Sequence, residues 1–326
     1  MRTNGDLKNI LSHKLTQIIS TIIIGLAVLL TLYPPKIDFF QKTAEFAPQL
    51  MFGMLLGSFI FLIFNQTRLM FISLMATGLI AFYLKMASNT NFMYPDTTML
   101  PKMRVVNFNL SSFNRQTINL DSILNTQDAD LVCFQEYTPD WDAMISKELK
   151  SSFPYAHKMV KADPFGMALY SKKKFNDIRT FYYEKVPNIH ILIENEMEDI
   201  NVICSYMPIV YPKPEMNQLE HLNVLTDHIQ KLKKPVISLG DFNMVYWSPP
   251  LTEFMNRAQL DNSRRSGSPL RLKIYDHIFY SDYLECVQFN EIQDKQKNHI
   301  GIAGTYQLKS HLSGAHSKKI GSLSNF

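Results

Sequence analysis

The sequence is poor in cysteine: Cys133, Cys204 and Cys286 are the three in a chain of 326 residues. They lie far apart, so they offer no closely spaced pair of the kind that forms a zinc cluster. Cys133 and Cys204 lie inside short apolar runs typical of buried strands, and free cysteine usually behaves as a small core residue. We therefore expect buried free thiols, and the redox compartment of the protein stays open.

Glycine-rich loops that bind nucleotide phosphates are also missing. Neither G-x-G-x-x-G nor G-x-x-x-x-G-K-[ST] occurs in the sequence, and there is no internal repeat or low-complexity tract. These absences argue against nucleotide binding by either route.

Most of the chain lacks an excess of positive charge. Residues 1–86 hold seven of the 33 Lys and Arg residues and three of the 29 Asp and Glu residues, which leaves 26 of each sign downstream. Proteins that bind nucleic acid usually present a basic surface, because counterion release from the phosphates supplies much of their affinity. The neutral remainder weakens the case for a DNA substrate without excluding one.

Long apolar stretches are concentrated in the first quarter of the chain. Residues 15–33, 46–67 and 69–84 contain no charged side chain, and Pro34 and Pro35 follow the first stretch. A run of about 20 apolar residues matches the hydrocarbon thickness of a bilayer. The pattern predicts a membrane anchor of three transmembrane helices over residues 15–86. A cleaved signal peptide is the weaker alternative, since two more apolar segments follow, and a buried soluble helical domain is the other.

The orientation of this anchor is not decided by counting charges. The positive-inside rule compares the basic residues on the two sides of the membrane. Here the count is four on each side: Arg2, Lys8, Lys14 and Arg68 on one, and Lys36, Lys42, Lys102 and Arg104 on the other. The first helix usually dominates, and a basic segment precedes it. We therefore expect a cytoplasmic N-terminus over residues 1–14 and an integral protein of the plasma or inner membrane with an extracytoplasmic catalytic domain.

The rest of the chain divides into a linker, one domain and a tail. Residues 87–102 are polar and contain two prolines, which predicts a linker. Residues 310–326 are rich in Ser, Gly and Lys and predict a flexible tail. Between them, residues 103–309 hold eight apolar runs of strand length, at 104–109, 131–135, 166–171, 188–194, 201–206, 235–239, 275–280 and 300–308.

Helical patterns lie between some of these runs. The clearest covers residues 215–232, where leucine and isoleucine recur at three- and four-residue spacing, and we expect its His221 and His228 to face solvent. Many short strands with fewer helices favour an α/β domain of two packed sheets flanked by helices.

Polar residues end several of the strand-like runs. Five short motifs of this kind are present: V-N-F-N at 106–109, C-F-Q-E at 133–136, G-D-F-N at 240–243, Y-D-H-I at 275–278 and K-N-H-I at 297–300. A single carboxylate after a strand is ordinarily a solvated turn residue or a helix cap. Five endings of this kind together predict a site at the edge of a sheet.

At these residues the sequence resembles the endonuclease/exonuclease/phosphatase superfamily, of the bacterial membrane-anchored type. The resemblance covers residues 103–308 and rests on DADLVCFQE (128–136), FGMALYSK (165–172), LGDFN (239–243) with Trp247-Ser248-Pro249, and DHIFYS (276–281). G-D-F-N alone is only modest evidence for the family. Together with Q-E upstream and D-H-I-F downstream, in this order and spacing, it is a specific match. The resemblance implies a DNase I-like four-layered α/β sandwich.

The resemblance also implies roles for the matching residues. Glu136 matches a metal ligand, and Asn109 matches the residue that helps to organise the metal and the phosphate. Asp241 matches the residue that orients or deprotonates the attacking water, and Asn243 matches a phosphate contact. His299 matches a residue that acts on the phosphate or as general acid/base, with Asp276 orienting it.

Two positions are open to a second interpretation. Tyr206 falls where family members place a His or a Tyr that can hydrogen-bond the phosphate, but a strand-end aromatic that packs on the core fits equally well. Asn298 stands where the family has an aspartate that binds metal. Its amide oxygen can still face a cation, yet the loss of one charge weakens metal affinity. Reduced activity, altered metal choice and loss of catalysis all remain open.

The expected function is therefore a metal-dependent phosphoesterase, either a phosphodiesterase or a phosphomonoesterase. Carboxylate and amide oxygens suit Mg²⁺ or Mn²⁺. The expected partners are the lipid bilayer and a phosphate-ester substrate, which can be nucleic acid, phospholipid or a small molecule, and no obligate protein partner is evident. The alternative is a catalytically impaired, membrane-anchored binding or scaffold protein of the same fold.

A basic cluster at Arg264, Arg265, Arg271 and Lys273 is interpreted as a solvated loop.

Overall fold

The computed structural model describes residues 13–35, 44–89, 91, 93–113, 128–208, 217–233, 235–265, 275–294 and 296–309. The chain divides into two compact units. A helical unit comprises Met1–Thr90, Val245–Thr252 and Ser266–Ile274, and an α/β unit comprises Asn91–Met244, Glu253–Arg265 and Tyr275–Phe326. The expected tail at 310–326 lies outside the described residues.

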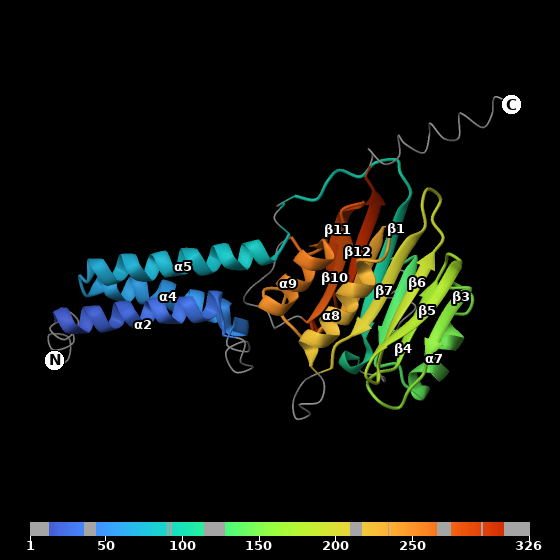
Figure 1. The fold of residues 1–326 in the computed structure, drawn as a ribbon, viewed down its shortest axis with the longest axis horizontal. Coiled ribbons are helices and arrows are strands. Elements are labelled where there is room, and N and C mark those ends of the chain that lie inside the picture. The colour runs from blue at the N-terminus through green and yellow to red at the C-terminus, as the bar shows by residue number, and fades with distance from the viewer. Residues whose placement is uncertain are drawn as a thin grey trace. The chain divides into compact units, whose positions relative to one another are not determined.

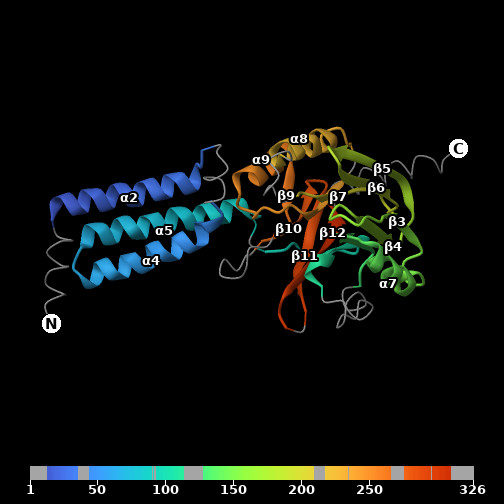
Figure 2. The ribbon, with the colours of Figure 1, turned by 90° about the horizontal axis from the view of Figure 1, so that it is seen from below.

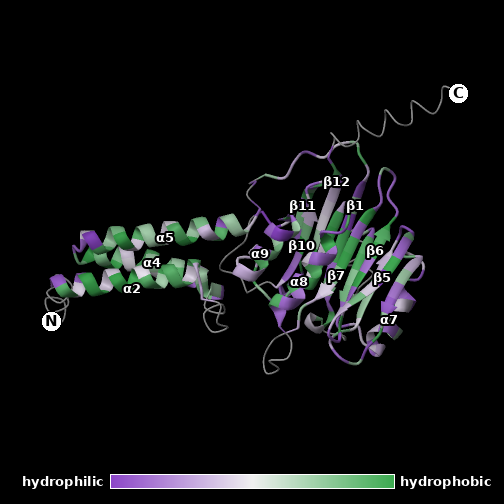
Figure 3. Ribbon diagram, in the orientation of Figure 1, coloured by the Kyte–Doolittle hydropathy of each residue, from purple (hydrophilic) through white to green (hydrophobic). Residues whose placement is uncertain are grey.

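The helical unit contains three helices that are long and apolar enough to cross a membrane, as predicted. They are α2 (Lys14–Leu32), α4 (Ala47–Ile63), preceded by the short η1 (Ala44–Phe46), and α5 (Thr67–Ala87). Hydrophobic residues make up most of these helices (Figure 3), and many of their side chains are exposed: Ile22, Leu62 and Phe82 are each more than half exposed. An apolar surface of this extent is what a lipid environment would cover.

Polar contacts inside the helical unit are made at a few close approaches. Ser73 Oγ of α5 donates to the Met54 carbonyl oxygen of α4 at 2.6 Å. Gly57 lies opposite, where an added Cβ would stand 3.3 Å from Ser73 Oγ. Gln17 Nε2 of α2 donates to Gln66 Oε1 at 2.9 Å. Small residues and hydrogen bonds between helices are the usual devices for packing apolar helices together.

Two six-stranded sheets form the centre of the α/β unit (Figure 1). Sheet A has the order β11-β12-β1-β2-β4-β3, and sheet B has the order β5-β6-β7-β8-β10-β9. The strands of sheet A are β1 (Lys102–Asn109), β2 (Leu131–Gln135), β3 (Tyr155–Met159), β4 (Met167–Ser171), β11 (Leu284–Gln293) and β12 (His299–Leu308). Those of sheet B are β5 (Phe175–Tyr183), β6 (Val186–Ile193), β7 (Ile200–Tyr206), β8 (Val236–Asp241), β9 (Leu260–Asn262) and β10 (Asp276–Ser281).

Each sheet has one parallel pair at its centre, and this pair determines where the polar strand endings meet. β1 pairs with β2 in parallel, and β7 pairs with β8 in parallel. β12 runs antiparallel to β1, and β10 runs antiparallel to β8. The carboxyl ends of the parallel strands therefore lie beside the amino ends of β10 and β12.

Helices cover the outer faces of the two sheets, giving four layers (Figure 2). α7 (Pro139–Leu149) buries Trp141, Ile145 and Leu149 against sheet A. α8 (Gln218–Ile229) lies on sheet B, and Phe254 of α9 (Pro249–Ala258) contacts the rings of Phe242 and Phe279. The main core lies between the sheets and contains the inward-facing aliphatic side chains of both. The predicted class, two packed sheets flanked by helices, is confirmed.

Two sequence interpretations are wrong in this part of the molecule. His221, a residue of α8, is fully buried and hydrogen-bonds Asn188 Oδ1 at 3.0 Å, so it does not face solvent. Arg264 and Arg265 are 2% and 5% exposed, so they do not belong to a solvated loop. Arg264 forms an ion pair with Glu291, and Arg265 lies over the ring of Tyr94 at 4.8 Å. Arg271 and Lys273 lie outside the described residues.

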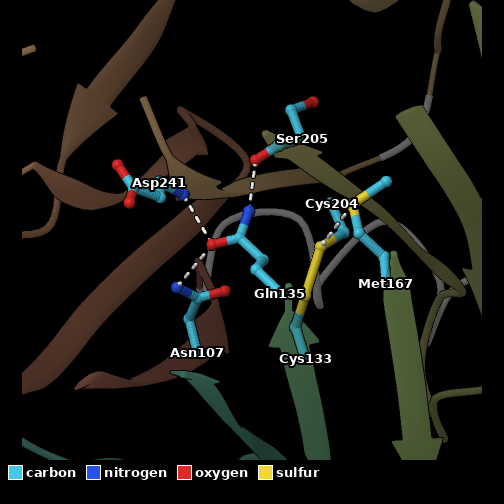
Figure 4. The surroundings of a disulfide bond; sticks show 7 residues. All are labelled: Asn107, Cys133, Gln135, Met167, Cys204, Ser205 and Asp241. Atoms are coloured by element: carbon cyan, nitrogen blue, oxygen red, sulfur yellow. Dashed lines mark hydrogen bonds between the residues drawn. A yellow bond between two sulfur atoms is a disulfide. The ribbon is translucent and has the colours of Figure 1, made fainter. Parts of the chain in front are cut away.

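The cysteine prediction is also wrong for two of the three residues. Cys133 of β2 and Cys204 of β7 form a disulfide that joins the two sheets inside the core (Figure 4). Cys286 is free and buried, as expected. Seventy-one positions separate the bonded residues, so their pairing depends on sheet packing that the spacing alone does not reveal.

Candidate active site

The predicted site residues gather where the two parallel pairs end. Asn109 is the last residue of β1, and Glu136 follows β2 directly; both belong to sheet A. Asp241 ends β8 and Asp276 begins β10 in sheet B, while His299 begins β12 in sheet A. The antiparallel register places Asp276 opposite Asp241. Residues scattered over almost 200 positions thus reach one end of the sandwich.

The amide of Asn109 joins the two sheets at this end. Its Nδ2 donates to Glu136 Oε1 at 3.0 Å and to Asp241 Oδ2 at 2.9 Å. Its Oδ1 accepts from the backbone N–H of Ser111 at 3.0 Å and from the Ser111 hydroxyl at 2.8 Å. Because both ends of the amide have partners, its orientation is well defined. Asn109 therefore holds two carboxylates of different sheets near each other.

Asp241 is a buried acid of the cluster, at 7% exposed. Its Oδ1 accepts from the backbone N–H of Asn243 at 2.9 Å. Burial, followed by the negative charge of Asp276, raises the pKa of Asp241 to about 7, although the hydrogen bonds from Asn243 and Asn109 oppose this. A carboxylate that takes up a proton near neutral pH is suited to general base work.

The backbone beside these acids adopts an uncommon conformation. Glu136 and Asn243 both have positive φ angles, of 55° and 48°. Such conformations are maintained only when the surroundings hold them, and they often occur at functional sites. For Asn243 the holding contact is a hydrogen bond from Nδ2 to the Met207 carbonyl oxygen at 2.6 Å.

His299 and Asp276 form a second contact between the sheets. His299 Nε2 lies 2.9 Å from Asp276 Oδ2, with the two side chains 19% and 8% exposed. The other ring nitrogen, Nδ1, has no hydrogen-bond partner among the residues that the structure describes. A carboxylate on one nitrogen orients the ring and leaves the other nitrogen to exchange a proton with a ligand.

Tyr206 packs on the core, and its phenol also lies near the acids of the cluster, while its contact with a phosphate stays a prediction. It is 6% exposed and belongs to the core between the sheets, where its ring meets Phe165 edge-on at 6.1 Å. Burial, and after it the charges of Glu136 and Asp241, raise the pKa of its phenol, so the hydroxyl stays protonated. The phenol therefore lies near both acids as a hydrogen-bond donor.

Gln135 is a site residue to which sequence reasoning assigned no role. It is fully buried at the end of β2, and its Oε1 accepts from the backbone N–H of Asp241 at 2.8 Å (Figure 4). Its Nε2 donates to the Ser205 carbonyl oxygen at 2.6 Å, and Asn107 Nδ2 donates to its Oε1 at 3.3 Å. The available signal was a polar amide inside an otherwise apolar strand, directly before a candidate metal ligand.

Asn298 and His277 have contacts outside this network. Asn298 Nδ2 donates to Asp294 Oδ2 at 2.8 Å in the turn before β12, and this side chain is exposed. His277 is 1% exposed, and its Nε2 donates to the Met244 carbonyl oxygen at 2.7 Å. Burial lowers the pKa of His277 to about 4, which keeps the ring neutral. Asn298 as a metal ligand stays a prediction, and His277 has a structural environment.

The donor atoms of the cluster are compatible with a hard divalent cation. Among the described residues, no three His, Cys, Asp or Glu side chains lie close enough together to hold a metal by themselves. Mg²⁺, however, usually binds through one or two carboxylates and keeps several waters. Glu136 and Asp241, both joined to Asn109, supply such oxygens. Asn109 directs its NH₂ group at the acids, so it would have to turn to bind a cation through oxygen.

Comparison with known proteins gives one family match. A model of the Endonuclease/Exonuclease/phosphatase family matches residues 104–293, which is more than half of the chain. No curated protein matches. The matched region contains the two sheets up to β11 and every candidate site residue except Asn298 and His299.

Similar solved structures share the fold at low sequence identity. TDP2 of Caenorhabditis elegans has a TM-score of 0.52 at 13% identity, covering 64% of this chain and 74% of that one. An endonuclease/exonuclease/phosphatase of Bacteroides vulgatus has a TM-score of 0.52 at 12% identity, covering 64% and 100%. TDP2 of D. rerio, complexed with single-strand DNA product, has a TM-score of 0.50 at 14% identity, covering 63% and 99%.

Proposed function

The chain belongs to the endonuclease/exonuclease/phosphatase family, and we propose that it is a membrane-anchored, divalent-metal-dependent hydrolase of phosphate esters. The observation that carries the proposal is the contact of Asn109 with Glu136 and Asp241, beside the His299–Asp276 pair. Phosphate-ester hydrolysis needs a base for water, donors for the phosphoryl oxygens and a hard cation. Residues suited to each task lie together at this end of the sandwich.

Asp241 is the proposed base for the attacking water. Its carboxylate is fixed by hydrogen bonds to both of its oxygens, from Asn243 and Asn109. A base with a pKa near the working pH accepts a proton most effectively. Because Asp241 is buried, it also has few water molecules competing for that proton.

His299 is the proposed general acid or phosphate donor on the other side of the cluster. Asp276 accepts a hydrogen bond from Nε2 and so orients the ring, which leaves Nδ1, without a partner among the described residues, to face a phosphoryl or leaving oxygen. Tyr206 and Asn243 are the proposed neutral donors to the phosphate. Their positions beside the acids support these roles.

Glu136 is the proposed anchor of the cation, with Asn109 and Asn298 as further ligands. A bound Mg²⁺ or Mn²⁺ supplies Lewis-acid stabilisation of the phosphoryl oxygens. Positive charge beside Asp241 favours its ionised form and so opposes the effect of burial on its pKa. The neutral Asn298, in place of an acid, leaves this site with less negative charge.

The anchor and the disulfide support the proposed location. Three apolar helices indicate an integral membrane protein. Disulfides persist in oxidising compartments and are rare in the cytosol, so the Cys133–Cys204 bond supports an extracytoplasmic catalytic unit and a cytoplasmic N-terminus. Anchoring and the neutral charge of the domain favour a phospholipid or small phosphate ester. A nucleic acid stays the second substrate class, since a similar fold holds DNA product in TDP2 of D. rerio.

The test is an assay of the full-length protein in detergent micelles. Bis-p-nitrophenyl phosphate, plasmid DNA and a phospholipid panel are each supplied with Mg²⁺, with Mn²⁺ or with EDTA. We expect metal-dependent turnover that is lost in Asp241→Ala and in His299→Ala. The preferred substrate identifies the substrate class. Turnover that persists in both variants would contradict the assignment of the site.

The alternative function is a binding or scaffold protein that has lost catalysis through Asn298. It predicts that the native protein binds Mg²⁺ in calorimetry but hydrolyses none of the substrates. Asn298→Asp decides between the two, because it restores the missing charge. Turnover in Asn298→Asp but not in the native protein would support a binding or scaffold function for the native protein.

A further inference from the structure

The side chain of Gln135 occupies a place where a backbone hydrogen bond of sheet B would otherwise lie. At one end of the β7–β8 pair, the Asn201 N–H donates to the Pro235 carbonyl oxygen at 2.8 Å. At the other end, the Met207 N–H donates to the Asp241 carbonyl oxygen at 2.9 Å. Bonds in a parallel pair recur every two residues along each strand. By that repeat, the Asp241 N–H should donate to the Ser205 carbonyl oxygen.

Both of these backbone groups bond to Gln135 instead. The Asp241 N–H donates to Oε1 at 2.8 Å, and the Ser205 carbonyl oxygen accepts from Nε2 at 2.6 Å (Figure 4). A side-chain amide carries one acceptor group and one donor group, so it can replace a single backbone bond without leaving either strand unsatisfied. The amide of a sheet A residue is thus inserted between two strands of sheet B.

Gly240 has a conformation that fits this insertion. Its φ is +148°, and an added Cβ would lie 1.8 Å from the Ser205 carbonyl oxygen and 2.7 Å from Gln135 Nε2. Any larger residue would push into the two atoms that form the bridge. The glycine of the G-D-F-N word is therefore required by the bridge, immediately before Asp241.

We propose that Gln135 is a positioning residue: its amide replaces one backbone bond of the β7–β8 ladder and thereby sets the location of Asp241 relative to Glu136. The inference rests on the proposed function, since Asp241 is the proposed base. Gln135 precedes Glu136 directly, and Cys133, two residues earlier, is covalently bound to Cys204 of β7. The Gln135 amide and the disulfide thus hold Asp241 of sheet B at a defined place relative to Glu136 of sheet A.

The test compares two substitutions that each remove a buried amide bonded to the β7–β8 pair, one at each end of the pair. Gln135→Met keeps the length of the side chain but removes the bridge. Asn201→Leu is the matched control: Asn201 is 5% exposed, its Nδ2 donates to the Pro235 carbonyl oxygen at 3.2 Å, and it lies at the far end of the β7–β8 pair. The full-length protein in detergent micelles is used throughout.

Two readouts separate positioning from general stability. For Gln135→Met we expect faster hydrogen exchange at the Asp241 amide, by about tenfold or more. We also expect kcat on bis-p-nitrophenyl phosphate with Mg²⁺ or Mn²⁺ to fall by roughly 100-fold, with KM within about twofold. For Asn201→Leu we expect exchange to change near residue 201, with kcat and KM both within about twofold.

Several outcomes would overturn the inference. Native kcat in Gln135→Met, unchanged exchange at Asp241, or an equal loss of kcat in both variants would each do so. If Gln135→Met does not fold, Gln135→Glu takes its place: it keeps an acceptor for the Asp241 N–H and loses the donor to Ser205, so the exchange increase should appear at residues 205–207. A native protein that hydrolyses no substrate would contradict the proposed function, while the exchange data would still decide whether Gln135 holds Asp241.

Discussion

The two sheets bring different chemistry to the candidate active site. Sheet A supplies hydrogen-bond donors, Asn109 and His299, together with one carboxylate, Glu136, while sheet B supplies the buried acids Asp241 and Asp276. Each of the two side-chain pairs that cross between the sheets joins a donor of sheet A to an acid of sheet B, at 2.9 Å. Sheet A holds one donor–acid pair of its own, Asn109 with Glu136 at 3.0 Å, but Asp241 and Asp276 receive their side-chain donors from the other sheet. The site therefore depends on how the sheets pack.

The outer faces of the sheets differ as well. On sheet A, Lys158 of β3 bonds Asp142 of α7 at 2.8 Å, beside the hydroxyl groups of Tyr137 and Tyr170. On sheet B, the polar contacts with α8 include two histidines of that helix: His221 with Asn188, and His228 with His190 at 3.1 Å. Burial lowers the pKa of all three imidazoles, to about 4 for His221 and His228. Sheet B should therefore be the acid-sensitive half.

The largest expected effect comes from removing the carboxylate of sheet A. Glu136→Gln should lower metal-dependent turnover by about 10³-fold, equivalent to about 4 kcal/mol of barrier, because the proposed cation loses its anchoring charge. Turnover and Mn²⁺ affinity are measured together. Glu148→Gln, at an exposed position of α7, is the control and should leave both unchanged. Equal turnover in the two variants would remove Glu136 from the site.

The second prediction concerns the covalent link between the sheets. Replacing Cys133 and Cys204 together by alanine should lower the free energy of unfolding by about 2–4 kcal/mol, as is typical for loss of a disulfide. Urea denaturation measures the change, and Cys286→Ala controls for the loss of a buried thiol outside the link. Thiol counting on the denatured native protein should find one free cysteine. Three would show that the sheets are not joined.

The third prediction separates the stability of sheet B from its function. Because burial raises the pKa of Asp241 from 3.8 to about 7, its ionised form costs stability above about pH 7, and this cost is relieved as the pH falls toward 4. In EDTA, Asp241→Asn should stabilise the protein by roughly 2 kcal/mol at pH 8 and by less at pH 4. Thermal unfolding at both values measures this. A variant that is destabilised at pH 8 would contradict the sign.

The smallest expected effect tests the acid sensitivity of sheet B. A histidine whose folded pKa is lowered loses stability as the pH falls below about 6.5, where the unfolded chain binds a proton, until the folded pKa near 4 is reached. His221→Gln keeps a donor for Asn188 but cannot titrate. It should reduce the stability lost between pH 7.5 and pH 4.5 by about 1 kcal/mol.

Hydrogen exchange at pH 4.5 should show α8 opening before α7 in the native protein, and this order should weaken in His221→Gln. Identical pH dependence of the variant and the native protein would mean that the histidines of sheet B do not limit its stability in acid.

Sequence reasoning found the interior of both sheets and missed their edges. All eight predicted strands are present, as β1, β2, β4, β6, β7, β8, β10 and β12. The four missed strands, β3, β5, β9 and β11, are the edge strands of the two sheets. A central strand is buried on both faces and so forms a continuous apolar run. An edge strand such as β3 is largely exposed and carries no such run.

The same contrast applies to single residues. The leucine spacing predicts the helix α8, but it does not predict that His221 of this helix is buried. Its buried position is explained by Asn188, a partner 33 residues away. Gln135 was part of a recognised word, yet its function depends on Ser205 and Asp241 of the other sheet.

The sequence by itself determined the apolar helices, the α/β class, the family and the residue types that the chemistry requires, because composition, periodicity and short motifs are local properties of the chain. Only the tertiary structure decided which partners these residues have. The Cys133–Cys204 bond, the Asn109 contact with two acids and the insertion of Gln135 into the β7–β8 ladder all depend on the register and packing of two sheets. Register and packing are set by many distant contacts at once, so no local pattern encodes them.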